Sequence, residues 1–164
     1  MRRFSLILIV IVFSVLMSCS SLIDQPEADE SILVFYVEEF HKPINKPLIK
    51  LQVDGLENPL KLSLKAPAAV VHLVPEEHLH ASGWITGNDI TLNGLDNFDF
   101  TAPAGTITLA PIKIQVISKS QVEVKLLTNL DLEYAKGRFA KNQDFAGLKI
   151  NYPEIVTEAE TSSE

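Results

Sequence analysis

The strongest constraint on the fold is an alternation of apolar and polar residues between Val122 and Tyr134. Because successive side chains of a strand point to opposite faces, this period of two predicts a long strand with one face in a core. A helix from Leu130 to Asp144 is the competing interpretation. We favour the strand, because glycine costs about 1 kcal/mol inside a helix and Lys136-Gly137 suits a hairpin turn. The residues of the apolar parity are Val122, Val124, Leu126, Leu130, Leu132 and Tyr134.

Shorter stretches of strand character fill most of residues 32–152. Ile32–Val37 is a continuous apolar run rich in β-branched and aromatic residues, which is typical of a strand buried on both faces. Pro111 interrupts the apolar stretch 107–116 and indicates an edge strand or a bulge. We therefore predict an all-β fold, a single antiparallel β-sandwich or curved half-barrel, following a cleaved N-terminal signal helix.

The first 18 residues differ from the rest in composition. Arg2 and Arg3 precede the apolar run Phe4–Leu16. This run is shorter than the roughly 20 residues that a helix needs to span a bilayer, and it matches the apolar region of an export signal. We therefore expect the leader to direct export and then to be removed.

The leader ends in Leu16-Met17-Ser18-Cys19, and Cys19 is the only cysteine of the chain. This segment resembles the lipobox of bacterial membrane lipoproteins, which has an aliphatic residue three positions before the cysteine and a small residue directly before it. The resemblance implies cleavage before Cys19, a diacylglycerol on its thiol and an acyl chain on its new amino group. Ser20, in place of aspartate, implies by the same resemblance an anchor in the outer rather than the inner membrane.

These features divide the chain into four parts. We expect a signal peptide in 1–18, a lipidated tether in 19–31, a β-rich domain in 32–152 and a disordered acidic tail in 153–164. Loss of the leader leaves 12 of the 14 basic residues against all 21 acidic residues, a net charge of −9. Such a charge argues against nucleic-acid binding, which usually requires a basic face.

Three of the four histidines lie within nine residues, beside Glu76 and Glu77. If the chain is extended after Pro75, then Glu76, His78 and His80 share one face, and His72 on the other side of the proline adds a fourth ligand. Imidazole and carboxylate groups suit zinc or copper. The competing interpretation is a solvated loop whose histidines and glutamates face water.

The chain contains no P-loop, no GxSxG and no GxGxxG, and its predicted mature form has no free thiol. We therefore expect no catalytic residue and no enzyme activity. The first binding function is a lipid-anchored module that contacts an envelope protein. The edge marked by Pro111 and the acidic tail are its candidate surfaces.

The second binding function is a periplasmic carrier of lipid or another hydrophobic ligand, bound in the concave face of a curved sheet. Its candidate ligand face is the apolar parity of the long strand, Val122, Val124, Leu126, Leu130, Leu132 and Tyr134, together with Ile112, Ile114 and Val116. A carrier requires a cavity that its own side chains leave empty, whereas a packed sandwich fills the same space.

Overall fold

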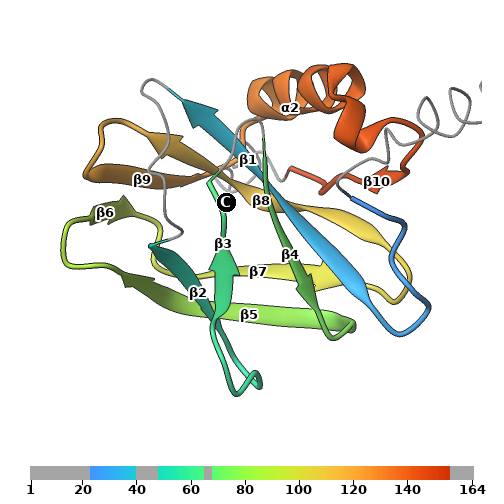
Figure 1. Ribbon diagram of the computed structural model, residues 1–164, viewed down its shortest axis with the longest axis horizontal. Helices are drawn as coiled ribbons and strands as arrows, with labels where there is room; N and C mark the ends of the chain where they lie inside the picture. Colours follow the sequence, from blue (N-terminus) through green and yellow to red (C-terminus); the bar gives the residue numbers. More distant parts are fainter. Residues whose placement is uncertain (1–22, 40–47, 65–67, 156–164) are drawn as a thin grey trace, which may run out of the picture.

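The computed structural model describes residues 23–39, 48–64 and 68–155 and consists mainly of two β-sheets and one α-helix (Figure 1). The predicted leader, Cys19 and residues 156–164 of the predicted tail lie outside the described residues. The described residues include parts of the predicted tether and of the predicted tail. Ile23, from the predicted tether, is buried against the domain, and Ile155, from the predicted tail, packs partly against it.

The larger sheet has six strands in the order β4-β1-β8-β9-β6, with β10 also paired to β8. Its strands are β1 (Ser31–Glu39), β4 (Ala68–Leu73), β6 (Thr91–Gly94), β8 (Ile107–Val116), β9 (Gln121–Leu126) and β10 (Ile150–Asn151). The smaller sheet has the order β3-β2-β5-β7 and contains β2 (Ile49–Val53), β3 (Leu60–Leu62), β5 (Glu76–Thr86) and β7 (Phe98–Ala102). The helices are α2 (Asn129–Lys141) and the 3-10 helix η1 (Gln143–Phe145).

The all-β prediction is confirmed only in that the fold is mainly β, because α2 adds a helix, and the prediction of a wholly antiparallel fold is wrong. The smaller sheet is antiparallel, whereas β1–β8, β6–β9 and β10–β8 are parallel pairs in the larger sheet. The parallel partners β1 and β8 are separated in the chain by all four strands of the smaller sheet. Apolar alternation is the same in both strand directions, so it carries no information about this long-range pairing.

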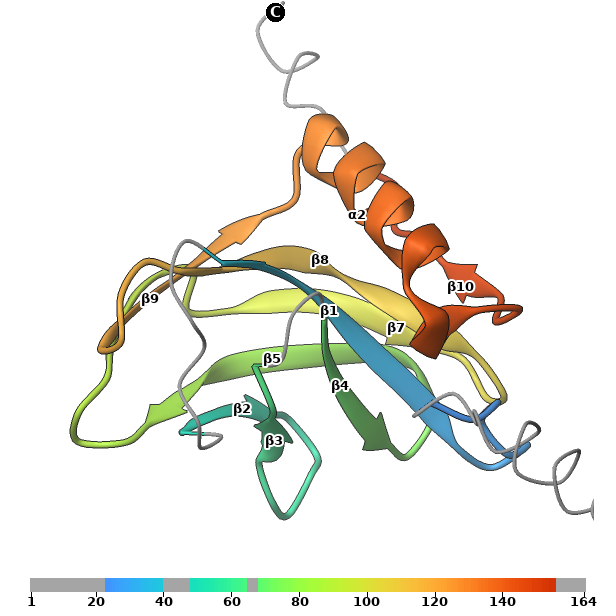
Figure 2. The ribbon, with the colours of Figure 1, turned by 45° about the horizontal axis from the view of Figure 1, so that its top comes forward.

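The main core lies between the inner faces of the two sheets. Leu33, Phe35 and Val37 of β1 belong to one buried cluster with Leu51 of β2 and Phe100 of β7. The other face of β1, with Ile32, Val34 and Tyr36, is also buried. The prediction that Ile32–Val37 is buried on both faces is therefore confirmed, because the smaller sheet covers one face and α2 packs over the other (Figure 2).

The predicted long strand ends at Leu126, and the competing helix is correct for Asn129–Lys141. Thr128 caps the helix in a capping box with Asp131, in which each side chain accepts a hydrogen bond from the other residue's backbone N–H. Gly137 does not prevent the helix. An added Cβ there would meet nothing within 4 Å, so no close packing requires a glycine. The glycine costs the helix about 1 kcal/mol relative to alanine, through its greater backbone freedom in the unfolded chain.

Pro111 marks a bulge and not an edge. The register between β1 and β8 shifts between Val34 and Tyr36, opposite the proline. Strand β8 is central, with β1 on one side and β9 and β10 on the other. The Pro111 carbonyl accepts a hydrogen bond of 2.9 Å from the Leu127 N–H. The sheet edge that the sequence suggested as a binding surface therefore does not exist at this position.

Candidate functional site

The predicted hydrophobic ligand face does not form one surface. Val122 and Val124 are buried in the core between the sheets, as are Ile112, Ile114 and Val116 of the neighbouring strand. Leu132 is buried under the helix. Leu126, Leu130 and Tyr134 are exposed. The face is divided because the chain changes from strand to helix after Leu126. Residues two positions apart lie on the same side of a strand, but not of a helix.

Three large apolar side chains near the junction of β9 and α2 remain in solvent. The exposed fractions are 58% for Leu126, 64% for Leu130 and 60% for Tyr134. Leu130 and Tyr134 are one helical turn apart and lie away from the buried stripe of Leu132, Ala135 and Phe139. We refer to Leu126, Leu130 and Tyr134 as the β9–α2 apolar surface. Among the described residues, the other exposed large hydrophobic side chains are Val74 and Ile85.

Two open hollows of about 270 and 400 Å³ lie beside strand β7. Both are lined by Asp99 of β7, Pro111 of β8 and Glu154 of the C-terminal segment, so they adjoin. We refer to them together as the β7 groove. Leu126 lines the larger hollow, which connects the groove to the β9–α2 apolar surface. The other residues that line the β7 groove, taking both hollows together, are Leu95, Asn97, Phe98, Phe100, Thr101, Pro103, Thr108, Leu109, Leu127, Asn151, Tyr152, Pro153 and Ile155.

The predicted metal ligands do not come together. His72 on β4 contacts Glu30, and Glu76 stands opposite Ala102 at the start of β5. His78 and His80 do share a face of β5, as their spacing predicts, but this segment is a strand and not a solvated loop. In the ranges 23–39, 48–64 and 68–155, no group of three His, Cys, Asp or Glu residues is arranged to hold a metal ion.

The sequence interpretation missed Asp99, the carboxylate that both β5 histidines contact. Nδ1 of His80 lies 2.8 Å from Asp99 Oδ1, and Nε2 of His78 lies 3.5 Å from the same oxygen. Asp99 stands directly opposite His80 in the antiparallel pair of β5 and β7. Since these strands are joined through β6, which belongs to the other sheet, no local signal in the sequence predicts their pairing.

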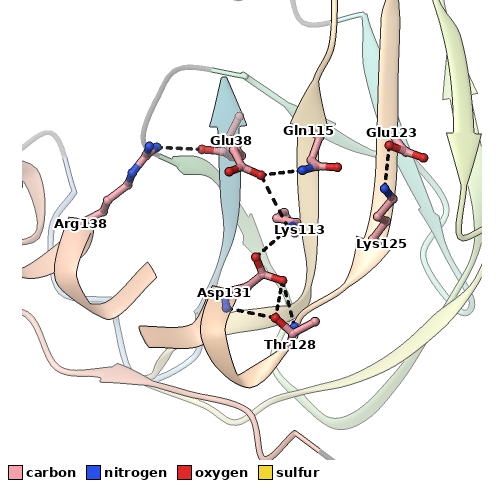
Figure 3. A network of polar contacts seen from close by, with 9 residues as sticks. Glu38, Lys113, Gln115, Glu123, Lys125, Thr128, Asp131 and Arg138 are labelled. Carbon is pink, nitrogen blue, oxygen red and sulfur yellow. Dashed lines mark hydrogen bonds and ion pairs between the residues drawn. The ribbon is translucent and has the colours of Figure 1, made fainter. Parts of the chain in front are cut away.

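A partly buried polar network joins the start of α2 to the larger sheet (Figure 3). Nζ of Lys113 lies 2.6 Å from Asp131 Oδ1 and 3.6 Å from Glu38 Oε2, and Gln115 donates a hydrogen bond to the same Glu38 oxygen. The side chains of Lys113 and Asp131 are each only 13% exposed. About two turns further along the same face of the helix, Arg138 donates to the Val37 carbonyl oxygen and lies over the ring of Tyr36.

The pKa values in this network favour the ion pair. Burial would raise the pKa of Asp131, but hydrogen bonds from Lys113 and Thr128 outweigh it and hold the pKa below the ordinary 3.8. Burial would likewise lower the pKa of Lys113, but the carboxylates of Asp131 and Glu38 hold it above the ordinary 10.5. Because both charges are stabilised by each other, we assign this network to helix docking and not to ligand binding.

Comparisons with known proteins add no family to these observations. No protein-family model, no curated protein and no solved structure matches this chain. Within the part of the chain that the structure describes, no helix has the length and apolar character needed to cross a membrane. The β9–α2 apolar surface and the adjoining β7 groove are therefore the basis for a functional assignment.

Proposed function

We propose that this protein is a lipid-anchored lipoprotein of the bacterial cell envelope whose β-rich domain is a non-catalytic protein-interaction module. The observation that carries the proposal is the exposure of Leu126, Leu130 and Tyr134, of which Leu126 also lines the β7 groove. Burying apolar surface is favourable by about 25 cal/mol per Å², and apolar patches on soluble domains commonly mark contact sites. A partner that covers these side chains would gain this free energy.

For the fold class we favour a β-sandwich over a curved half-barrel. One buried cluster takes side chains from the inner faces of both sheets, as two sheets packed face to face require. α2 then adds a third layer outside the larger sheet.

The short chain between the predicted anchor and the domain supports a position at the membrane surface. Ile23 is only 6% exposed and packs in the cluster under α2. Three residues lie between it and Cys19, and the four steps from Cys19 to Ile23 reach at most about 14 Å even when fully extended. Two or three acyl chains on Cys19 would anchor the protein stably. Ser20 favours the outer membrane by its resemblance to sorted lipoproteins.

The function as a carrier of a hydrophobic ligand has less support than the protein-interaction module. Five residues of its candidate ligand face are packed between the sheets, namely Val122, Val124, Ile112, Ile114 and Val116. A hydrophobic ligand would have to displace these side chains from a shared core, which costs several kcal/mol for each large residue. The exposed members of the predicted face are better placed to meet a partner from outside.

We expect the mature protein to begin at Cys19 and to carry the added acyl chains. Intact-mass measurement of membrane-extracted protein should show a chain that lacks residues 1–18 and is heavier by a diacylglycerol and one acyl group. Cys19→Ala should lose all acyl mass and keep the leader, because the modified thiol is the signal for cleavage in this family. An unmodified wild-type Cys19 would overturn the proposed anchor.

We expect the β9–α2 apolar surface to contact a protein in cells. A photoreactive amino acid placed at Leu130 or Tyr134 should give a discrete crosslinked polypeptide. The same probe at the exposed Glu57 or Lys61, at the far side of the smaller sheet, should give none. Crosslinks to lipid only would favour the carrier. Equal crosslinking at all four positions, or none at any, would contradict the proposed module.

A further inference from the structure

We infer that the β7 groove binds an extended, cationic peptide segment of a protein partner, which adds a strand to the free edge of β7. This inference rests on the proposed function, because it names the chemistry of the partner for the same interaction surface. Three independent features of the groove lead to it: the strand that forms one wall, the apolar residues that line it, and the sign of its charged groups.

The first feature is the position of β7 at the end of the smaller sheet. Strand β7 pairs with β5 on one side, and no strand pairs with its other side among the residues that the structure describes. A free strand edge presents backbone N–H and C=O groups that a second chain can pair with. The β7 groove lies along this edge, between β7, β8 and residues 151–155.

The second feature is the alternation that the groove would impose on a bound segment. Its lining includes accessible apolar side chains from several parts of the chain, such as Pro103, Pro111, Leu126 and Ile155. Side chains of an added strand point alternately to its two faces. One set would therefore meet these apolar residues, while the other set would face outward with Asp99 and Thr101, the exposed residues of β7.

The third feature is charge. Among the residues that the structure describes, Asp99 and Glu154 are the only charged ones that line the groove, and both are acidic. The whole chain has a net charge of −7, so a second copy would be repelled. The chain's own continuation after Ile155 carries Glu158, Glu160 and Glu164 but no basic residue, which disfavours it as the occupant. Charge complementarity therefore favours a basic segment of another protein.

The first test measures binding of two synthetic probes to the full-length protein in a non-ionic detergent. The probes are capped, fluorescently labelled decapeptides of alternating Val and Lys or alternating Val and Glu, with binding to empty micelles subtracted. We expect the Val-Lys probe to bind and the Val-Glu probe not to bind. The paired substitutions Asp99→Asn and Glu154→Gln should weaken Val-Lys binding by about three- to tenfold at low salt.

The matched control for charge is Glu57→Gln with Asp89→Asn, which removes two exposed carboxylates outside the groove. This control should leave the dissociation constant of the Val-Lys probe within about twofold, because the two sites are not in contact with the groove. An equal loss of binding in both double variants would mean that the Val-Lys probe is attracted by the overall negative charge of the protein, and it would overturn the assigned site.

The second test asks whether the probe binds as a strand. N-methyl groups on every second residue remove the N–H donors of one edge of the Val-Lys probe. One of the two possible methylated series should lose binding and the other should keep it. Backbone amide NMR signals should shift in Phe98–Ala102 and not in Leu60–Leu62, at the opposite edge of the same sheet. Equal binding of both series, or shifts at β3 instead, would overturn strand addition.

The two proposals fail in different ways. If crosslinks at Leu130 and Tyr134 occur in cells while the Val-Lys probe does not bind, the interaction module stands and the groove inference is wrong. If neither result is obtained, the proposed function itself is wrong. Circular dichroism of each variant before the binding measurement ensures that a loss of binding does not come from unfolding.

Discussion

Replacing Phe139 with alanine is expected to lower the free energy of unfolding by about 3–5 kcal/mol. The side chain is only 2% exposed, and its ring centroid lies 4.8 Å from that of Phe145. It belongs to the cluster that packs α2 on the outer face of the larger sheet, so truncation removes buried apolar surface and leaves a cavity. Urea denaturation followed by circular dichroism measures this change.

Tyr134→Ala is the matched control in the same helix. Tyr134 is exposed, so this substitution should change the free energy of unfolding by less than about 0.5 kcal/mol. It should instead weaken the association with the partner identified by crosslinking. If Phe139→Ala costs no more than Tyr134→Ala, the helix is not docked on the sheet through Phe139. This pair of variants therefore separates the residue that supports the fold from the residue that we assign to binding.

Replacing Gly94 with alanine is expected to cost about 2–4 kcal/mol, because two penalties act at once. Gly94 has a φ of +107°, a conformation that side-chain-bearing residues rarely adopt. An added Cβ would also lie 2.1 Å from the carbonyl oxygen of Val124. That oxygen belongs to the backbone of β9 and accepts a hydrogen bond from the Leu95 N–H, so it cannot move without disturbing the β6–β9 pair.

Gly83→Ala is the control for this second substitution. Gly83 is also in a strand, its φ is not in the positive region, and an added Cβ meets nothing within 4 Å. Its substitution should change the free energy of unfolding by less than about 0.5 kcal/mol in either direction. Equal effects at Gly94 and Gly83 would mean that β6 is not held against β9 as described. The urea concentrations at which the two variants are half unfolded are sufficient to compare them, provided that the free energy of unfolding depends on urea concentration with the same slope in both.

The candidate site was predictable only in fragments. The spacing of His78 and His80 correctly predicts that they share a face of one strand. Their contact with Asp99 requires β5 to pair with β7, and this pairing is formed across an intervening strand of the other sheet. The alternation of apolar and polar residues wrongly predicts that Leu130 and Tyr134, which are exposed, lie on the buried face of a strand. Thr128 and Asp131 form a local capping signal that would have placed them on a helix instead.

The sequence by itself determined the strand character of most of residues 32–126 and the burial of Ile32–Val37 on both faces. These properties follow from side-chain shape and the period of two, which act locally. Only the tertiary structure decided that β1 and β8 run parallel, that Pro111 lies in a central strand, and that β7 remains at an edge. The physical reason is that strand order and direction depend on which distant segments meet to bury a common core, and hydrophobic burial has no direction along the chain.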